Sequence, residues 1–77
     1  MIVTYSMPEC PVTPEIRRFA ERFGLEFFWK NAESKQFQKE LSNMGQCVVP
    51  LTVVGDDMVV GYDAKKLEKL IRRNKLI

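Results

Sequence analysis

The sequence predicts a single small α/β domain of 77 residues, built on a mixed sheet with helices on both faces. Two observations support this prediction. First, strand-like and helix-like patterns alternate from residue 2 to residue 44, and a strand–helix–strand unit forms a parallel, right-handed pair. Second, the alternation is followed by an apolar hairpin pattern and one last amphipathic helix. The expected element order is therefore β-α-β-α-β-β-α, in which the hairpin adds antiparallel strands to the sheet.

The first third of the chain contains two strand patterns with a helix between them. Ile2–Ser6 is rich in residues that favour β-structure and predicts the first strand. A helix is expected from Pro14, because apolar residues recur after it at the i, i+3, i+4, i+7 spacing of a buried helix face. Gly24 suits the end of that helix. The short aromatic stretch Leu25–Lys30 predicts the second strand.

The middle of the chain predicts a second helix and a hairpin. An apolar i, i+4, i+7 repeat indicates a helix from about Ser34 to Met44. Val48–Val54 predicts a third strand that is entered through a proline, and Met58–Tyr62 predicts the returning strand. Between the two strands, Gly55–Asp57 predicts the turn.

The C-terminal segment predicts one last helix, from about Ala64 to Arg73. Its apolar stripe is formed by Leu67, Leu70 and Ile71. Asp63 directly precedes the helix and is expected to be its N-cap. The chain shows no linker, repeat or low-complexity tract, so residues 1–77 are expected to form one domain.

Composition and charge argue against several functional classes. The net charge of +2 is too small to indicate binding to nucleic acid. No apolar run approaches the about 18 residues of a membrane span, so no membrane association is expected. The N-terminus lacks the basic region and the long apolar stretch of a signal peptide, which indicates a cytoplasmic protein. Two cysteines without a histidine argue against a metal site and exclude a Cys-His catalytic dyad.

Two short motifs point to a specific chemistry. Cys10-Pro11-Val12-Thr13 follows the first strand, and Val49-Pro50 precedes the hairpin. The run from Val49 to Asp63, Val-Pro-Leu-Thr-Val-Val-Gly-Asp-Asp-Met-Val-Val-Gly-Tyr-Asp, resembles the Val-Pro strand, Gly-Asp turn and Gly-aromatic-Asp helix start of small bacterial and archaeal glutaredoxins. Together with the Cys-Pro step, the resemblance covers nearly the whole chain. It implies the thioredoxin fold, with a four-stranded mixed sheet, and thiol-disulfide chemistry.

The resemblance also implies roles for individual residues. Cys10 matches the nucleophilic cysteine, and Pro50 matches the cis-proline that lies opposite it. Val49 matches the residue whose backbone pairs with the cysteinyl part of glutathione, and the Gly-Tyr-Asp loop matches the segment that binds the γ-glutamyl end. The expected glutathione-binding residues are Pro11, Val12, Thr13, Val49, Pro50, Gly61, Tyr62 and Asp63.

Three residues around Cys10 depart from the family pattern. The family's motifs are Cys-Pro-Tyr-Cys or Cys-Gly-Phe-Ser, and Thr13 cannot resolve a mixed disulfide, so dithiol reduction of protein disulfides is expected to be largely lost. Glu9 adds a like charge, which is expected to raise the pKa of a Cys10 thiolate. Pro14 favours either a late helix start with Thr13 as N-cap or a distorted first turn. Both arrangements predict a weaker nucleophile than a true glutaredoxin has.

Three functions remain open at this point. The first is a monomeric thiol-disulfide oxidoreductase with Cys10 as single nucleophile, working with glutathione or with a protein thiol or disulfide partner. The second is a redox-inactive binding module that uses the Val49-Pro50 groove and carries Cys10 as a plain loop cysteine. The third is an iron-sulfur carrier, in which one cysteine per chain and glutathione thiols bridge two subunits. Cys47 could resolve Cys10 across the two loops or serve as a small, partly buried residue.

Overall fold

A four-stranded mixed sheet forms the centre of the molecule. The computed structural model describes residues 1–45 and 49–76. Its elements in chain order are β1 (Ile2–Ser6), α1 (Thr13–Arg22), β2 (Phe27–Asn31), α2 (Lys35–Asn43), β3 (Leu51–Val54), β4 (Asp57–Val60) and α3 (Ala64–Arg73). The strand order is β2-β1-β3-β4, with β1 parallel to β2 and the other pairs antiparallel. The α/β class, the thioredoxin fold and the element order expected from the sequence are confirmed.

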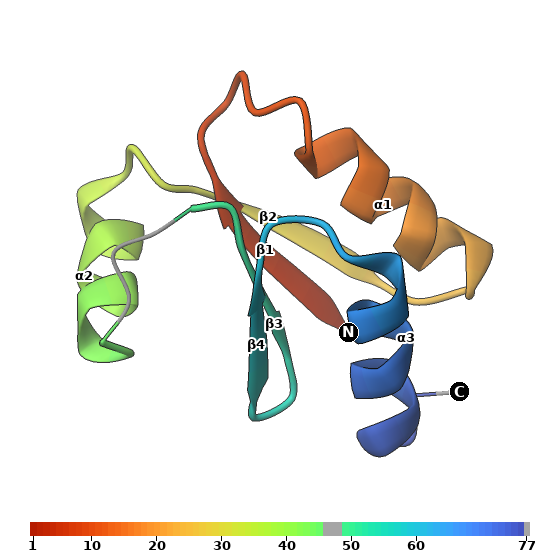
Figure 1. Cartoon of the computed structure of the whole chain (residues 1–77). Helices are drawn as coiled ribbons and strands as arrows, with labels where there is room; N and C mark the ends of the chain where they lie inside the picture. The colour runs from red at the N-terminus through yellow and green to blue at the C-terminus, as the bar shows by residue number, and fades with distance from the viewer. Residues whose placement is uncertain (46–48, 77) are drawn as a thin grey trace.

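Helices cover both faces of the sheet, and each face has its own core. In Figure 1, α1 and α3 lie together on one side of the strands and α2 lies alone on the other. The core under α1 and α3 consists of Ile2, Ile16, Phe19, Ala20, Val54, Val59, Leu67 and Ile71. The smaller core under α2 consists of Tyr5, Ala32, Leu41 and Leu51. The expected arrangement of helices on both faces is therefore present.

The first helix starts late, but its cap differs from the expected one. α1 begins at Thr13, and its N-cap is Val12, which makes no side-chain capping hydrogen bond. The expectation that Thr13 is the N-cap is therefore wrong by one residue. The physical reason is that the Thr13 hydroxyl is engaged elsewhere, because it lies 2.6 Å from the Ser6 hydroxyl oxygen. Pro14 lies in the first turn, where a missing N–H removes no helical hydrogen bond.

Two strand boundaries also differ from the expected ones. The second strand begins at Phe27 rather than Leu25, because the Leu25 amide donates to the Ala20 carbonyl at 2.9 Å and so closes the end of α1. The third strand begins at Leu51, directly after Pro50, whose missing N–H cannot donate to a sheet ladder. Val48, the expected first residue of that strand, lies outside the described residues.

The hairpin is tighter than expected. β4 begins at Asp57, which pairs with Val54, so only two residues remain in the turn. At the far end, β4 stops at Val60 and the chain turns away at Gly61, which has a φ of +75°. α3 follows with the expected bounds, and Asp63 caps it by accepting a hydrogen bond from the Lys66 amide at 3.1 Å. Within the described part of the chain, none of the helices has the length and apolar character needed to cross a membrane.

Candidate functional site

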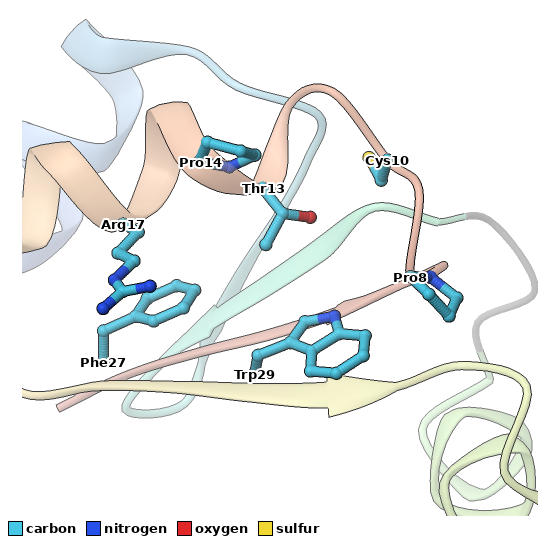
Figure 2. A pocket seen from close by; sticks show the side chains of 7 residues that line it. All are labelled: Pro8, Cys10, Thr13, Pro14, Arg17, Phe27 and Trp29. Carbon is cyan, nitrogen blue, oxygen red and sulfur yellow. The ribbon is translucent and has the colours of Figure 1, made fainter.

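Cys10 lies in the short loop that joins β1 to α1. The loop is turned tightly, because the Cys10 amide donates to the Met7 carbonyl at 3.1 Å. The Cys10 side chain is half-buried and forms no disulfide within the described residues. Figure 2 shows Cys10 on the loop between Pro8 and the start of α1 at Thr13, with Trp29 on the strand across from it. Cys10 is therefore a free thiol with partial access to solvent.

Hydrogen bonds from the start of α1 act on the Cys10 sulfur. Burial alone raises the pKa of the Cys10 thiol, but the amide of Val12 and both the hydroxyl and the amide of Thr13 donate to the sulfur and lower it. The net pKa of Cys10 lies below its ordinary value, because donors favour the charged thiolate. Glu9 is not among the groups that shift this pKa. The expectation that Glu9 raises this pKa is therefore wrong.

Thr13 is also tied to the end of the first strand. Its hydroxyl oxygen lies 2.6 Å from the hydroxyl oxygen of Ser6, which is fully buried. Ser6 in turn accepts two contacts from the Trp29 indole nitrogen, at 2.8 Å to its hydroxyl oxygen and 3.2 Å to its carbonyl. Three elements, namely β1, β2 and α1, are thus joined by polar side chains next to Cys10.

A pocket of about 260 Å³ opens beside the thiol. It is lined by Pro8, Cys10, Thr13, Pro14, Arg17, Phe27 and Trp29. Figure 2 shows Arg17 extending from α1 towards Phe27 on β2, with Trp29 forming the floor nearer the cysteine. The walls are mainly aromatic rings and proline rings, with one guanidinium and one thiol. Such a pocket can accept an apolar group attached to a reacting sulfur.

Five of these lining residues were not singled out from the sequence as site residues. Arg17 lies four positions after Thr13, so both occupy one face of α1. Phe27 and Trp29 are two residues apart in β2 and share a face of the sheet. Both signals are periodicities, and each is visible in the sequence. The parallel pairing of the first two strands was expected, but the register that places Trp29 beside the Cys10 loop was not.

The Val49–Pro50 segment lies at the same end of the sheet as the Cys10 loop. Pro50 directly precedes Leu51, which pairs with Tyr5 near the end of β1, the strand from which the Cys10 loop leaves. The Val49–Pro50 peptide bond is cis. The Gly61 amide donates to the Pro50 carbonyl at 2.8 Å, so the start of the Gly-Tyr-Asp loop is bound to this segment. Both motifs therefore lie at the same end of the two central strands.

The structure separates the expected glutathione-binding residues into two groups. Thr13 lines the pocket beside Cys10, and Pro11 and Val12 belong to the same loop. Val49, Pro50, Gly61, Tyr62 and Asp63 do not line that pocket. Tyr62 and Asp63 are exposed, and Asp63 already serves as the cap of α3. Cys47, the expected second thiol, lies outside the described residues.

Comparisons with known proteins identify the fold family. No protein-family model matches the chain, and no curated protein matches its sequence. Among solved structures, a glutaredoxin from Archaeoglobus fulgidus matches with a TM-score of 0.74 at 28% identity, over 92% of this chain and 85% of that chain. This chain is a glutaredoxin-like protein of the thioredoxin superfamily.

Two further solved structures resemble this glutaredoxin-like protein. The glutaredoxin-like protein NrdH-redoxin from Escherichia coli matches with a TM-score of 0.74 at 21% identity, over 90% of this chain and 92% of that one. A glutaredoxin from Brucella melitensis matches with a TM-score of 0.58 at 25% identity, over 97% and 82% of the two chains. The glutaredoxin-like protein thus has the fold of small thiol-disulfide redox proteins.

No group of three or more histidine, cysteine, aspartate or glutamate side chains that could hold a metal ion occurs in residues 1–45 and 49–76. Cys10 brings to the site of the glutaredoxin-like protein a thiol with hydrogen-bond donors around it. Because the thiolate is the nucleophilic form of cysteine, a site that favours the thiolate favours attack on disulfides.

Proposed function

We propose that this glutaredoxin-like protein is a thiol-disulfide oxidoreductase that uses Cys10 as its single nucleophile and glutathione as its reductant. The observation that supports the proposal is the set of donors at the start of α1, which lowers the pKa of Cys10 despite its partial burial. A lowered pKa increases the fraction of thiolate near neutral pH. Partial exposure leaves the sulfur open to a disulfide.

The proposed reaction has two exchange steps. In the first, the Cys10 thiolate attacks the glutathione sulfur of a protein–glutathione disulfide, the disulfide bond breaks, and the protein sulfur leaves as a thiolate. Cys10 is now in a mixed disulfide with glutathione. In the second, the thiolate of another glutathione attacks the glutathione sulfur of this mixed disulfide and releases the Cys10 thiolate. Overall, the protein–glutathione disulfide is reduced and the incoming glutathione is oxidised to glutathione disulfide.

A single nucleophile suits this substrate class better than protein dithiols. Thr13 stands three residues after Cys10 and has no thiol, so the Cys10–Thr13 motif offers no internal attack on a mixed disulfide. An external glutathione supplies the missing sulfur. Protein disulfides that need a second enzyme cysteine are therefore proposed to be poor substrates.

The glutathione groove that we propose follows the end of the sheet where both motifs lie. The backbone of Val49 would pair with the cysteinyl part, next to Pro50. The loop of Gly61, Tyr62 and Asp63 would bind the γ-glutamyl end, and the hydrogen bond from Gly61 to Pro50 holds this loop beside the Val-Pro segment. Pro11, Val12 and Thr13 would complete the groove on the Cys10 side. We also propose that the protein acts as a monomer in the cytoplasm, where glutathione is kept reduced.

A glutathione-coupled assay tests this proposal. The substrate is a mixed disulfide between glutathione and a small thiol, with glutathione disulfide formation as the readout. Cys10→Ser should abolish the activity, because serine has no thiolate. Cys47→Ser is the matched control and should keep most of it. Equal activity in the Cys10→Ser variant would overturn the oxidoreductase function and favour a redox-inactive binding module.

A further inference from the structure

Three polar side chains next to Cys10 form a continuous chain of hydrogen bonds. The Trp29 indole nitrogen lies 2.8 Å from the Ser6 hydroxyl oxygen, and that oxygen lies 2.6 Å from the Thr13 hydroxyl oxygen. Thr13 and Cys10 line the same pocket, and a hydrogen bond from the Thr13 side chain lowers the pKa of the Cys10 thiol. The four groups come from β2, β1, α1 and the loop before α1. They are therefore brought together by the fold and not by sequence proximity alone.

The donors and acceptors of each group allow these hydrogen bonds to run in one direction. An indole N–H can only donate, so Trp29 donates to Ser6. Between the Ser6 and Thr13 hydroxyls either oxygen can be the donor. When Ser6 donates its single hydrogen to Thr13, the Thr13 hydrogen is free for the Cys10 sulfur. In that arrangement every hydrogen bond points towards the cysteine.

We propose that Trp29, Ser6 and Thr13 form a directional hydrogen-bond relay that ends on the Cys10 sulfur and holds that sulfur in its thiolate form. The three are positioning residues for the nucleophile, and this role deepens the thiol-disulfide function proposed above, on which it rests. A thiolate can only accept hydrogen bonds, so a relay that can only donate at its end favours the thiolate over the thiol. Bonds in such a chain polarise one another, so the distant indole contributes to the last bond.

The relay gives Thr13 a function of its own in the Cys-Pro-Val-Thr motif. Its hydroxyl belongs to the relay while its amide also donates to the same sulfur. It also explains the position of Trp29, the only tryptophan in the chain. Trp29 is 42% exposed, but its one polar atom, the indole nitrogen, donates a hydrogen bond to buried Ser6. The indole lines the pocket beside Cys10, so its fluorescence is expected to respond to the charge on the sulfur.

Alkylation of Cys10 tests the relay, in a Cys47→Ser background where Cys10 is the sole thiol. The rate is measured as a function of pH with a neutral alkylating reagent. Thr13→Val keeps the shape of the side chain but removes the hydroxyl. It should slow alkylation about tenfold at a pH below the titration midpoint, because a hydrogen bond to a charged group corresponds to about one pKa unit or more. Thr13→Ser restores the hydroxyl and should alkylate like the parent.

Ser6 and Trp29, the two members of the relay that do not reach the sulfur, should have smaller effects on the alkylation rate than Thr13. Ser6→Ala and Trp29→Phe should each slow alkylation in the same direction, by about two- to threefold, because they act only through Thr13. Phe28→Leu is the matched control for Trp29→Phe, since Phe28 is an exposed aromatic residue in the same strand. It should leave the rate unchanged. Thermal unfolding of every variant identifies any loss caused by a damaged fold.

Tryptophan fluorescence supplies a readout that a merely structural role would not move. In the parent, the pH profile of Trp29 emission should have the same midpoint as the alkylation profile. Thr13→Val should shift both midpoints to higher pH, and Cys10→Ser should remove the emission step. Parent-like alkylation by Thr13→Val, or an equal loss in Thr13→Ser, would overturn the relay. Failure of the glutathione assay alone would instead remove the proposed function and leave the relay intact.

Discussion

The hydroxyl oxygens of Ser6 and Thr13 lie 2.6 Å apart, so the last residue of β1 is joined directly to the first residue of α1. This contact closes the intervening loop, which carries Cys10. Within the loop, the Cys10 amide donates a hydrogen bond to the Met7 carbonyl at 3.1 Å. The position of the thiol is therefore set by short-range bonds around it, and the donors of α1 can act on the sulfur from fixed positions.

The buried threonine pair in the sheet should behave as a coupled unit. Thr4 and Thr52 are register partners in β1 and β3, both fully buried, with their hydroxyl oxygens 3.0 Å apart. Thr52→Val leaves the Thr4 hydroxyl without this partner and should lower the free energy of unfolding by about 1–3 kcal/mol. The double variant with Thr4→Val should lose less than the sum of the two single variants. Urea denaturation measures all three, and strictly additive losses would contradict the coupling.

The cluster of Tyr5, Lys30 and Glu40 should make stability depend on pH at both ends. Glu40 accepts from the Tyr5 hydroxyl at 2.6 Å and from the Lys30 ammonium at 2.9 Å. These hydrogen bonds lower the pKa of Glu40 below its ordinary value of 4.5. A lowered carboxyl pKa gives a stabilisation that is present above pH 4.5 and is lost as the pH falls through the folded-state pKa. Glu40→Gln should therefore flatten the acid limb of the stability profile.

At alkaline pH the same cluster makes the protein less stable as the pH rises. Burial and the hydrogen bond with Glu40 raise the pKa of Tyr5 above 10.0, and the bond with Glu40 raises the pKa of Lys30 above 10.5. Raised values give a stabilisation that is present below about pH 10 and is lost at higher pH. Urea denaturation from pH 3 to 11 checks both limbs. Glu33→Gln, an exposed carboxylate outside the cluster, is the control, and an acid limb flattened as much by this control would contradict the assignment.

Two variants of Asp63 separate its capping role from the proposed glutathione contact. The Asp63 carboxylate accepts the Lys66 amide at 3.1 Å, so Asp63→Ala should lower the free energy of unfolding by about 1 kcal/mol. Asparagine caps a helix about as well as aspartate does, so Asp63→Asn should keep the stability. If the charge binds the γ-glutamyl end, Asp63→Asn should still raise the KM for glutathione. An unchanged KM in a stable Asp63→Asn variant would remove this contact from the groove.

Gly55 in the hairpin turn should resist substitution more than a glycine of similar backbone conformation. It has a φ of +60°, and a Cβ built there would clash with the Asn74 side-chain oxygen. Gly24 has a φ of +69° with nothing within 4 Å of such a Cβ. Both alanine variants incur a backbone cost of about 1 kcal/mol. Gly55→Ala should lose more than Gly24→Ala in urea denaturation, and equal losses would contradict a close contact at Asn74.

Much of the fold follows from local patterns in the sequence. The apolar spacing of α3 and the capping aspartate before it fix both ends of that helix, because both signals lie within a few residues of each other. Strand ends are less local. The start of β2 depends on the Leu25 amide, which closes α1, and the end of β4 depends on Gly61, which bonds to Pro50. Such partners lie in other elements, so strand periodicity alone misplaces these boundaries.

In the candidate site, too, short contiguous motifs can be predicted from the sequence, whereas contacts between distant elements cannot. Cys10 and the Val49–Pro50 motif can be located from the sequence, because both are short contiguous patterns. The role of Trp29 cannot, since its contact with Ser6 spans 23 positions and depends on the register between β1 and β2. The incorrect expectation that Glu9 raises the pKa of Cys10 has the same origin. The like charge of Glu9 is visible in the sequence, whereas the donors at Val12 and Thr13 become visible only with the helix start in place.

The most direct test of the account is the pKa of Cys10 itself, in an otherwise unmodified chain carrying Cys47→Ser. The pH dependence of alkylation gives this value without any assumption about the substrate. The donors at the start of α1 predict a midpoint below the ordinary cysteine pKa of about 8.5. A midpoint at or above that value would mean that the fold does not activate the thiol, and would contradict a catalytic role for Cys10.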